Sequence, residues 1–258
     1  MGIYNCASTL PEALDSLYAQ TFQDFKIILC EDGSKDDTYS VAKRYAEKHD
    51  NIILVRNEKN MGLNYTLNRC LEYADTEYCA RMDGDDISLP TRFEKEVKFL
   101  DEHPEFAIVS CPMIYFDEMG EFGRGKGGNE PTKESFMKGS PFCHAPCMVR
   151  REAYMKVGGY TVSKKLLRVE DYHLWMKMYA EGYCGYNLDE CLYAMRDDRN
   201  AAYRRKWSGS INESRVHFEA TKKLKLGFKG FLYSFRPIIV QLFPKFLYIH
   251  LHKRIMNK

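Results

Sequence analysis

Short apolar runs and helical patterns alternate along the first 110 residues of the chain. Four continuous apolar runs are typical of strands buried on both faces, namely Lys26–Cys30, Ile52–Val55, Tyr78–Met82 and Phe106–Cys111. Between them, apolar side chains at helical spacing predict helices over residues 8–20, 36–48, 63–73 and 90–103. Because strands and helices alternate in this way, we expect an α/β fold with a mostly parallel sheet flanked by helices.

The beginning of the chain departs from this pattern. Only Met1–Tyr4 precede the first predicted turn, whereas a sheet of this kind should open with a full strand. Either the sheet begins with the second strand, or half of the first strand is missing. We favour the second interpretation and expect the native N-terminus to extend before Met1.

The pattern is less regular after residue 112. Residues 113–145 are rich in glycine and predict a loop-rich segment beside a site. A helix over Val169–Glu181 and a strand over Cys191–Met195 are expected after it.

Two local patterns in this part of the chain suggest sites that we reject. Gly123–Gly128 fits the G-x-G-x-x-G pattern, but no helix follows it, so we interpret it as a flexible loop. Cys143, His144 and Cys147 resemble half of a zinc site, but no second pair has zinc spacing. We interpret these cysteines as core thiols.

The composition is that of a globular protein. Of 258 residues, 45% are hydrophobic and 29% are charged, which excludes a disordered chain. The nine cysteines are odd in number and several lie in apolar runs, so we interpret them as reduced, mostly buried thiols of a cytoplasmic protein. The net charge of +2 gives no indication of nucleic acid as a partner.

The charge is distributed unevenly along the chain. From Arg215 to Lys258, ten lysines and arginines accompany one acid, Glu219, so this segment carries +9 and residues 1–214 carry −7. Apolar and aromatic residues are frequent in the segment, but charges and prolines interrupt them too often for a membrane-spanning helix. Basic amphipathic helices lie on anionic membranes. We expect such a membrane surface as a partner; the alternative is a helical pair packed on the acidic body.

Three carboxylates occur within four residues, at Asp83, Asp85 and Asp86, between a predicted strand and a predicted helix. Such groups repel one another unless a cation lies among them, and Mg²⁺ or Mn²⁺ binds carboxylates together with substrate phosphates. The carboxyl ends of strands are also where open α/β sheets bind ligands. The residues alone leave open a solvated acidic turn.

Two pairs of acids are further candidates. Glu31 and Asp32 follow a predicted buried strand, where they could meet a base or a ribose. Glu170 and Asp171 begin a predicted helix, where one of them could act as a general base toward a hydroxyl. Acids in a first helical turn are also favoured by the helix dipole, which is a sufficient structural reason for either residue.

Together these motifs resemble those of the family 2 glycosyltransferases, which have the GT-A fold and, in bacteria, build surface polysaccharides. The resemblance covers about residues 1–200 and rests on several motifs in order: Tyr4-Asn5, Gln20-Thr21-Phe22, Glu31–Asp36, Asn60-Met61-Gly62, Asp83–Asp86 with Pro90 and Arg92, Arg150-Arg151-Glu152, Val157–Tyr160 and Glu170-Asp171. It implies a Rossmann-like GT-A domain that transfers a sugar, with inversion, from a nucleotide-diphosphate donor, for which we expect a UDP-sugar.

The resemblance also implies where the donor binds. It places six residues at the nucleotide sugar, namely Tyr4, Glu31, Asp32, Asn60, Gly62 and Asp83. Tyr4 would stack on the base, and Asp32, with Glu31 beside it, would hydrogen-bond the base. Asp83 on the ribose side and Asp85 would hold Mn²⁺ or Mg²⁺ against the two phosphates.

The same resemblance implies the chemistry at the acceptor. Asp171, with Glu170, would deprotonate the acceptor hydroxyl. The basic amphipathic tail suits an acceptor held in a membrane, such as a glycan linked to a polyprenyl diphosphate. The expected location is therefore the inner face of the plasma membrane, with the protein peripheral to it.

We expect residues 1–210 to form the GT-A domain, with a nucleotide-sugar half over 1–112 and an acceptor half over 113–210. Residues 211–258 would be an amphipathic helical tail that anchors the protein to a membrane surface. Two other functions remain as alternatives. A metal-dependent nucleotidyltransferase would need a basic, glycine-rich phosphate loop near the first strand, which the sequence lacks. A non-catalytic sugar-nucleotide-binding protein would not need the acids of the site.

Overall fold

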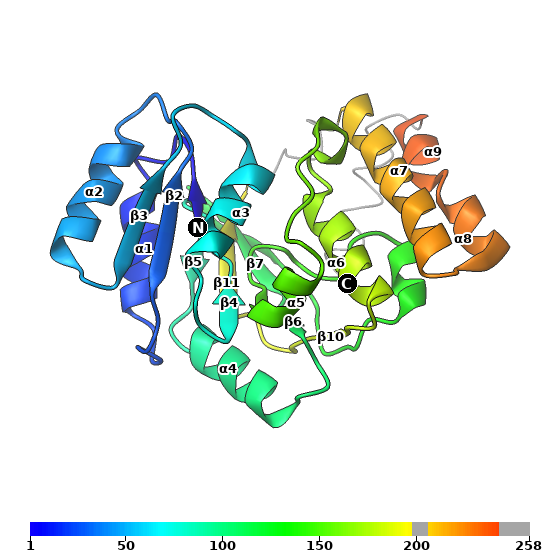
Figure 1. Cartoon of the computed structure of the whole chain (residues 1–258), viewed down its shortest axis with the longest axis horizontal. Coiled ribbons are helices and arrows are strands. Elements are labelled where there is room, and N and C mark those ends of the chain that lie inside the picture. Colours follow the sequence, from blue (N-terminus) through cyan, green and yellow to red (C-terminus); the bar gives the residue numbers. More distant parts are fainter. Residues whose placement is uncertain (198–205, 243–258) are drawn as a thin grey trace.

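The structure, a computed structural model, describes residues 1–197 and 206–242. The first half of the chain folds in the order β1 (Gly2–Ile3), α1 (Leu10–Tyr18), β2 (Ile27–Glu31), α2 (Thr38–Lys48), β3 (Ile52–Arg56), α3 (Leu63–Glu72), β4 (Tyr78–Ala80), β5 (Ile87–Ser88), α4 (Arg92–Glu102) and β6 (Ile108–Ser110) (Figure 1). Every strand and helix predicted in this half is present, with ends displaced by a few residues.

The second half contains a further set of strands and short helices. They are β7 (Met113–Asp117), β8 (Gly120–Arg124), η1 (Lys133–Met137), β9 (Met148–Arg150), α5 (Arg151–Lys156), η2 (Lys164–Leu166), α6 (Glu170–Ala180), β10 (Gly185–Asn187), β11 (Tyr193–Arg196), α7 (Trp207–Lys223), α8 (Gly227–Tyr233) and α9 (Arg236–Leu242). The predicted helix and strand of this half correspond to α6 and β11.

The expectation of an irregular segment over residues 113–145 is wrong at its beginning, where β7 and β8 form an antiparallel hairpin. The loop predicted at Gly123–Gly128 is present only after Arg124, where β8 ends, and its glycines are packed against neighbouring backbone. A Cβ atom on Gly127 would lie 1.9 Å from the carbonyl oxygen of Leu188, and the Gly128 N–H donates to Asn187 O at 2.9 Å. Glycine is therefore needed here because a side chain would prevent the close packing of the backbone, and not because the segment must be flexible.

The strands form three sheets. The first, β1-β2-β3, is parallel throughout, with Gly2 opposite Cys30 and Ile27 opposite Ile52. The sheets β10-β6-β9-β4 and β5-β11-β7-β8 mix parallel and antiparallel pairs, because β9 runs against both β6 and β4 and because β7 and β8 form a hairpin. The α/β class with flanking helices is thus confirmed, and strictly parallel pairing holds for the first sheet.

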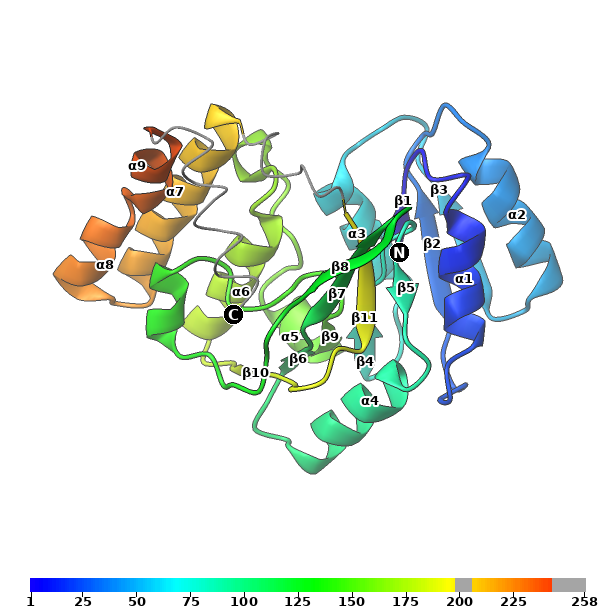
Figure 2. The same cartoon turned by 180° about the vertical axis from the view of Figure 1, so that it is seen from behind.

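Two large apolar cores support these layers, beside a small cluster of Cys30, Val55 and Cys70. One lies around the first sheet and α1, where Leu14 and Leu29 are fully buried. The other surrounds Trp175 of α6 and takes in Val216 and Ala220 of α7. Figure 2 shows α6 to α9 gathered at the end of the molecule opposite α1 and α2. The N-terminal part of the expected tail, α7, is therefore packed into the body.

Helices α8 and α9 pack against α7. In the described part of the chain, no helix combines the length and hydropathy that a membrane span requires. The rest of the expected tail, residues 243–258, lies outside the described residues. The nine cysteines form no disulfide in the described structure; four are buried and five are half-buried, so the expectation of mostly buried thiols is met in part.

Candidate active site

The chain turns sharply around Asp32 at the end of β2. The buried carboxylate accepts hydrogen bonds from Asn57 Nδ2 at 2.8 Å and from the backbone N–H groups of Met61 and Gly62 at 2.8 and 2.9 Å. Gly62 adopts a φ of +89°, which favours glycine, and α3 begins directly after it. The structure therefore brings three of the predicted residues, Asp32, Gly62 and the neighbouring Asn60, to the end of one strand.

Glu31 is held within the protein. Its side chain is fully buried, Oε2 accepts a hydrogen bond from Arg56 Nε at 2.9 Å, and Oε1 accepts one from the Ser34 N–H. These contacts fix the turn that presents Asp32.

Tyr4 lies on the end of β1, and the residue after it is tied to the same turn. The Asn5 N–H donates to Ser34 Oγ at 3.0 Å, and the Lys35 N–H donates to Asn5 Oδ1 at 2.9 Å. Tyr4 itself is 42% exposed. Its ring is thus accessible beside the turn that carries Asp32.

The three carboxylates after β4 form one group. Ligand oxygens of Asp83, Asp85 and Asp86 all lie within 4.8 Å of one another. Burial and then the negative charge of Asp83 raise the pKa of Asp85. A cluster of hard oxygen donors that repel one another fits Mg²⁺ or Mn²⁺, so these residues could hold such an ion.

Arg81 orders this group, a role that no sequence pattern indicated. Its guanidinium donates to both carboxylate oxygens of Asp83, at 2.9 and 2.6 Å. Burial alone would lower the pKa of Arg81, but the charge of Asp83 raises it on balance, so the guanidinium stays charged. Its positive charge also acts on Asp85 and on Asp171.

Asp86 is the third member of the carboxylate group predicted from the sequence, which gave it no separate role. Its carboxylate accepts hydrogen bonds from Tyr193 Oη at 2.9 Å and from the Arg196 N–H at 2.8 Å, both from β11. Burial, with repulsion from Asp83 and Asp85, raises the pKa of Asp86 to about 7. Two residues of β11, which is distant from Asp86 in the sequence, thus hold its carboxylate in place. In the sequence, the only indication of this position was that the acids Asp85 and Asp86 are adjacent.

Asp171 and Glu170 begin α6. Asp171 Oδ2 accepts a hydrogen bond from Ser140 Oγ at 2.9 Å, and Glu170 Oε2 is buried without a hydrogen-bond partner among the described residues. Burial raises the pKa of both carboxyls, and the positive charge of Arg81 opposes that rise in both. A carboxylate with a raised pKa is suited to accept a proton near neutral pH.

The structure shows the contacts that Cys143, His144 and Cys147, rejected above as half of a zinc site, make within the protein. His144 Nε2 is 2.8 Å from Tyr160 Oη, and burial together with the charge of Arg81 holds the pKa of His144 well below its usual range. The buried Cys147 thiol donates to Cys143 O at 2.8 Å. Within the described residues, no group of three metal-ligating side chains includes them.

Comparison with known proteins identifies the family to which this chain belongs. Glycosyl transferase family 2 matches residues 1–158. The chain is 40% identical over 260 residues to EpsE of Bacillus subtilis (strain 168), which is named as a glycosyltransferase, and the match covers all of this chain and 94% of that one. It is 29% identical over 258 residues to an Escherichia coli enzyme named UDP-Gal:alpha-D-GlcNAc-diphosphoundecaprenol beta-1,3-galactosyltransferase, with 96% and 91% of the two chains covered.

The fold is similar to that of solved protein structures. Residues 1–349 of S. aureus TarS in complex with UDP-GlcNAc superpose with a TM-score of 0.69 at 18% identity. The match covers 86% of this chain and 64% of that one, so this chain spans a little under two thirds of the TarS fragment. On the sequence matches, the chain is a glycosyltransferase that belongs to glycosyl transferase family 2.

Proposed function

We propose that this enzyme transfers a sugar, with inversion, from a UDP-sugar to a hydroxyl of a glycan linked to a polyprenyl diphosphate. The observation that carries the proposal is the position of Arg81. It bonds Asp83 in the acidic group and its charge also acts on Asp171 at the start of α6. One buried cation thus connects the acids proposed for the donor with the acid proposed for the acceptor.

The donor would lie along the ends of β1, β2 and β4. We assign stacking on the base to Tyr4, whose ring is accessible, and hydrogen bonding of the base to Asp32, which three donors hold in place. Glu31 is buried and accepts a hydrogen bond from Arg56, so we propose that it holds the turn around Asp32 in position. Asn60 and Gly62 complete this wall of the site.

Asp83 and Asp85 would hold Mn²⁺ or Mg²⁺, and Asp86 would support them from β11. When bound, the ion would neutralise charge that develops on the leaving diphosphate. Asp83 is already paired with Arg81, so we expect Asp85, the exposed member, to be the principal metal ligand.

Asp171 would accept the proton of the attacking hydroxyl. An alcohol has a high pKa, so its attack is helped by a carboxylate on the face opposite the leaving group. The raised pKa of Asp171 and its hydrogen bond from Ser140 suit this role. Glu170 would lie beside it as a second acid.

The acceptor class rests on the relatives and on the charge of the chain. The Escherichia coli relative is named for a diphosphoundecaprenol-linked acceptor. The helices α8 and α9 add exposed apolar side chains, including Phe228 and Leu242, to a basic segment. We therefore propose a GT-A domain over residues 1–210 and a C-terminal segment, 211–258, whose first helix, α7, packs on that domain and whose later part lies on the cytoplasmic surface of an anionic membrane.

The proposal is tested by hydrolysis and transfer assays with a panel of nucleotide sugars, in Mn²⁺, in Mg²⁺ and in a chelator. Metal-dependent release of one nucleoside diphosphate, increased by a polyprenyl-diphosphate-linked GlcNAc, is the expected result. The matched variants are Asp171→Asn, which should bind the donor without transfer, and Asp50→Asn, an exposed acid outside the site, which should behave as the parent. Transfer of the nucleotidyl group, with release of a sugar 1-phosphate in place of a nucleoside diphosphate, would contradict the proposal in favour of a nucleotidyltransferase.

A further inference from the structure

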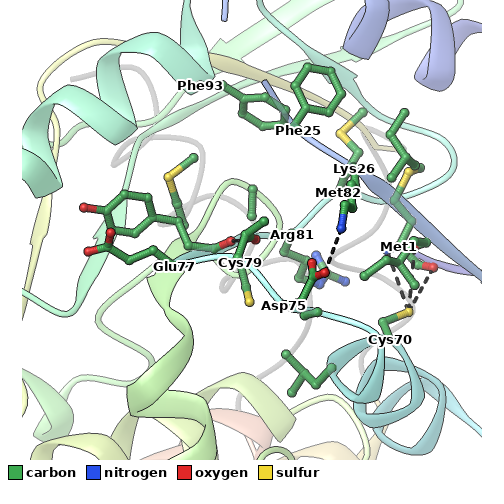
Figure 3. A pocket seen from close by; sticks show the side chains of 18 of the residues that line it. Met1, Phe25, Lys26, Cys70, Asp75, Glu77, Cys79, Arg81, Met82 and Phe93 are labelled. Atoms are coloured by element: carbon green, nitrogen blue, oxygen red, sulfur yellow. Dashed lines mark hydrogen bonds and ion pairs between the residues drawn. The ribbon is translucent and has the colours of Figure 1, made fainter. Parts of the chain in front are cut away.

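The acceptor proposed above carries an anionic diphosphate next to an apolar prenyl chain. Its site must therefore present unpaired cations beside apolar side chains. The cavity of about 510 Å³ between β2 and β4 does not meet this requirement (Figure 3). Of its two cationic side chains, Lys26 is paired with Asp75 at 2.7 Å. The other, Arg81, is paired with Asp83 at 2.6 Å. Unpaired cations beside apolar side chains occur instead on the surface next to α6.

Residues 162–168 form a basic strip that leads directly into Glu170 and Asp171 at the start of α6. Five residues of the strip are exposed, namely Val162, Lys164, Lys165, Leu167 and Arg168. No acid occurs between Glu152 and Glu170 in the sequence. Within the part of the chain that the structure describes, the three cationic side chains of the strip have no ion-pair partner. The strip thus carries three positive charges that a ligand could neutralise.

The first turns of α7 lie beside the basic strip. Asn212 Nδ2 donates to Leu167 O at 3.3 Å, and Asn212 Oδ1 accepts a hydrogen bond from Arg215 Nη1 at 3.0 Å. Trp207, Ile211 and Arg215 follow one another at a spacing of four, so they form one exposed stripe along the helix. Trp207 is 49% exposed and Ile211 is 38% exposed. Asn212 therefore joins this α7 stripe to the basic strip.

The unpaired charges on this surface are of one sign. Arg215 adds a fourth cation, which bonds only to a neutral amide among the described residues. The acid on the same turns of α7, Glu213, is half-buried, and its Oε1 lies 3.9 Å from His217 Nε2. Arg168 adopts a φ of +67°, which is rare for a residue with a side chain, so the packing around it must hold it in place. Cations and exposed apolar side chains thus share one surface, which is complementary to a diphosphate attached to an apolar chain.

We propose that the basic strip and the α7 stripe together bind the diphosphate and the first isoprene units of the lipid-linked acceptor. The inference rests on the proposed function, for which it gives the place of the acceptor. The four cations would pair with phosphate oxygens, and Leu167, Trp207 and Ile211 would cover the apolar chain. Arg168 precedes Asp171 by three residues, so their Cα atoms lie within about 11 Å of each other. The acceptor sugar, which is attached to the diphosphate, is thereby kept near the proposed base.

The test uses the full chain and a soluble probe, farnesyl diphosphate, and measures the fluorescence of Trp207. The chain has two tryptophans, and Trp175 is fully buried, so quenching by acrylamide reports on Trp207. We expect farnesyl diphosphate to protect Trp207 from acrylamide in the presence of a chelator, where the proposed metal site takes no part. Farnesol and inorganic pyrophosphate should each bind at least about tenfold more weakly, because each offers only half of the contacts.

Variants on this surface locate the binding. Replacing Lys164→Gln together with Lys165→Gln should weaken farnesyl diphosphate by about tenfold or more, because contacts with the phosphates are lost. Ile211→Ser should weaken farnesyl diphosphate several-fold and leave the affinity for pyrophosphate unchanged, because only the apolar contact is removed. The matched control is Lys48→Gln together with Lys98→Gln, which removes the same charge from exposed positions of α2 and α4. All these residues are exposed, so the thermal unfolding midpoint should stay the same.

Equal affinity of the parent and the Lys164 and Lys165 double variant for farnesyl diphosphate would overturn the proposal, as would equal affinity of the parent for farnesyl diphosphate and farnesol. Protection of Trp207 by anionic phospholipid vesicles, with none by farnesyl diphosphate, would overturn it in favour of a membrane surface. The donor assay decides the proposed function separately. A chain that hydrolyses a nucleotide sugar and does not bind farnesyl diphosphate keeps its function and lacks this site. A chain that binds farnesyl diphosphate as expected and turns over no donor has the site, and the proposed sugar transfer is then wrong.

Discussion

The Arg81 guanidinium donates two hydrogen bonds to the Asp83 carboxylate, from Nη1 to Oδ2 at 2.9 Å and from Nη2 to Oδ1 at 2.6 Å. The guanidinium is buried, and the same charge lowers the pKa of Asp171 and Glu170, which burial raises. A planar guanidinium can hold a carboxylate in a fixed orientation, whereas an ammonium group supplies only the charge. Arg81 is therefore expected to act in two ways, as a support for Asp83 and as a source of positive potential.

Arg81→Lys and Arg81→Gln separate these two effects. In Arg81→Lys we expect nucleoside-diphosphate affinity to fall by about tenfold or more, because the bidentate pair is lost, while the pH profile of transfer is kept. In Arg81→Gln the affinity should fall as well, and the acid limb of the profile should move to higher pH, because the charge that lowers the pKa of Asp171 is gone. Measurement of Kd and of kcat against pH checks both; identical profiles in the two variants would exclude the electrostatic effect.

Asp85→Asn should remove metal-dependent nucleotide binding and leave the fold intact. The cluster of Asp83, Asp85 and Asp86 is self-repelling without a cation, so loss of one charge should not lower the thermal unfolding midpoint measured in chelator. Titration calorimetry with Mn²⁺ and a nucleoside diphosphate provides the measurement, with Asp50→Asn as the control. Unchanged Mn²⁺-dependent binding in Asp85→Asn would show that the metal is held elsewhere.

Transfer should be lost as the pH falls through the pKa of Asp171, because the base must be deprotonated and its pKa is raised by burial. The hydrogen bond from Ser140 stabilises the charged form and lowers this pKa. Ser140→Ala should therefore move the acid limb to higher pH with little change in donor affinity. Asp171→Asn should lower kcat by about a hundredfold or more, the usual range for a general base. An unmoved limb in Ser140→Ala would argue against Asp171 as the titrating base.

Local sequence patterns were sufficient for the first sheet. The apolar positions of β2 and β3 are buried or half-buried on both faces, so they appear as continuous apolar runs, and the helices between them carry regular apolar faces. The β7–β8 hairpin was missed because its glycines are typical of loops. At Gly127 the same residue type serves close packing against Leu188, which no single-sequence pattern distinguishes from flexibility.

The candidate site was predictable where its residues are neighbours in the sequence. Asp83 and Asp85 stand out because carboxylates are concentrated in a short segment. Arg81 was not predicted, because its effect on Asp171 arises only when β4 and α6 come together. The anchoring of Asp86 by Tyr193 and Arg196 was missed for the same reason, since these contacts join distant parts of the chain.

The helices at the C-terminal end have two different apolar surfaces. Phe231 and Phe235 contact the ring of Phe218 on α7, with centroids 5.7 and 5.1 Å apart, so they belong to the packing of the helices. Phe228 and Leu232, four residues apart on α8, are 74% and 53% exposed. A pair at this spacing lies on one face of a helix.

Replacing this exposed pair tests the proposed membrane surface without disturbing the fold. In the double variant Phe228→Ser and Leu232→Ser, binding to anionic vesicles should fall by about tenfold or more, because two apolar side chains no longer enter the membrane interface. Met119→Ser is the matched control, since Met119 is 77% exposed on the β7–β8 turn, outside the basic segment. Vesicle sedimentation measures the effect, and binding of the parent should weaken with added salt because part of the attraction is electrostatic. If the double variant binds vesicles as the parent does, or if the parent does not bind anionic vesicles, α8 serves only the packing of the protein. The acceptor must then be reached in another way.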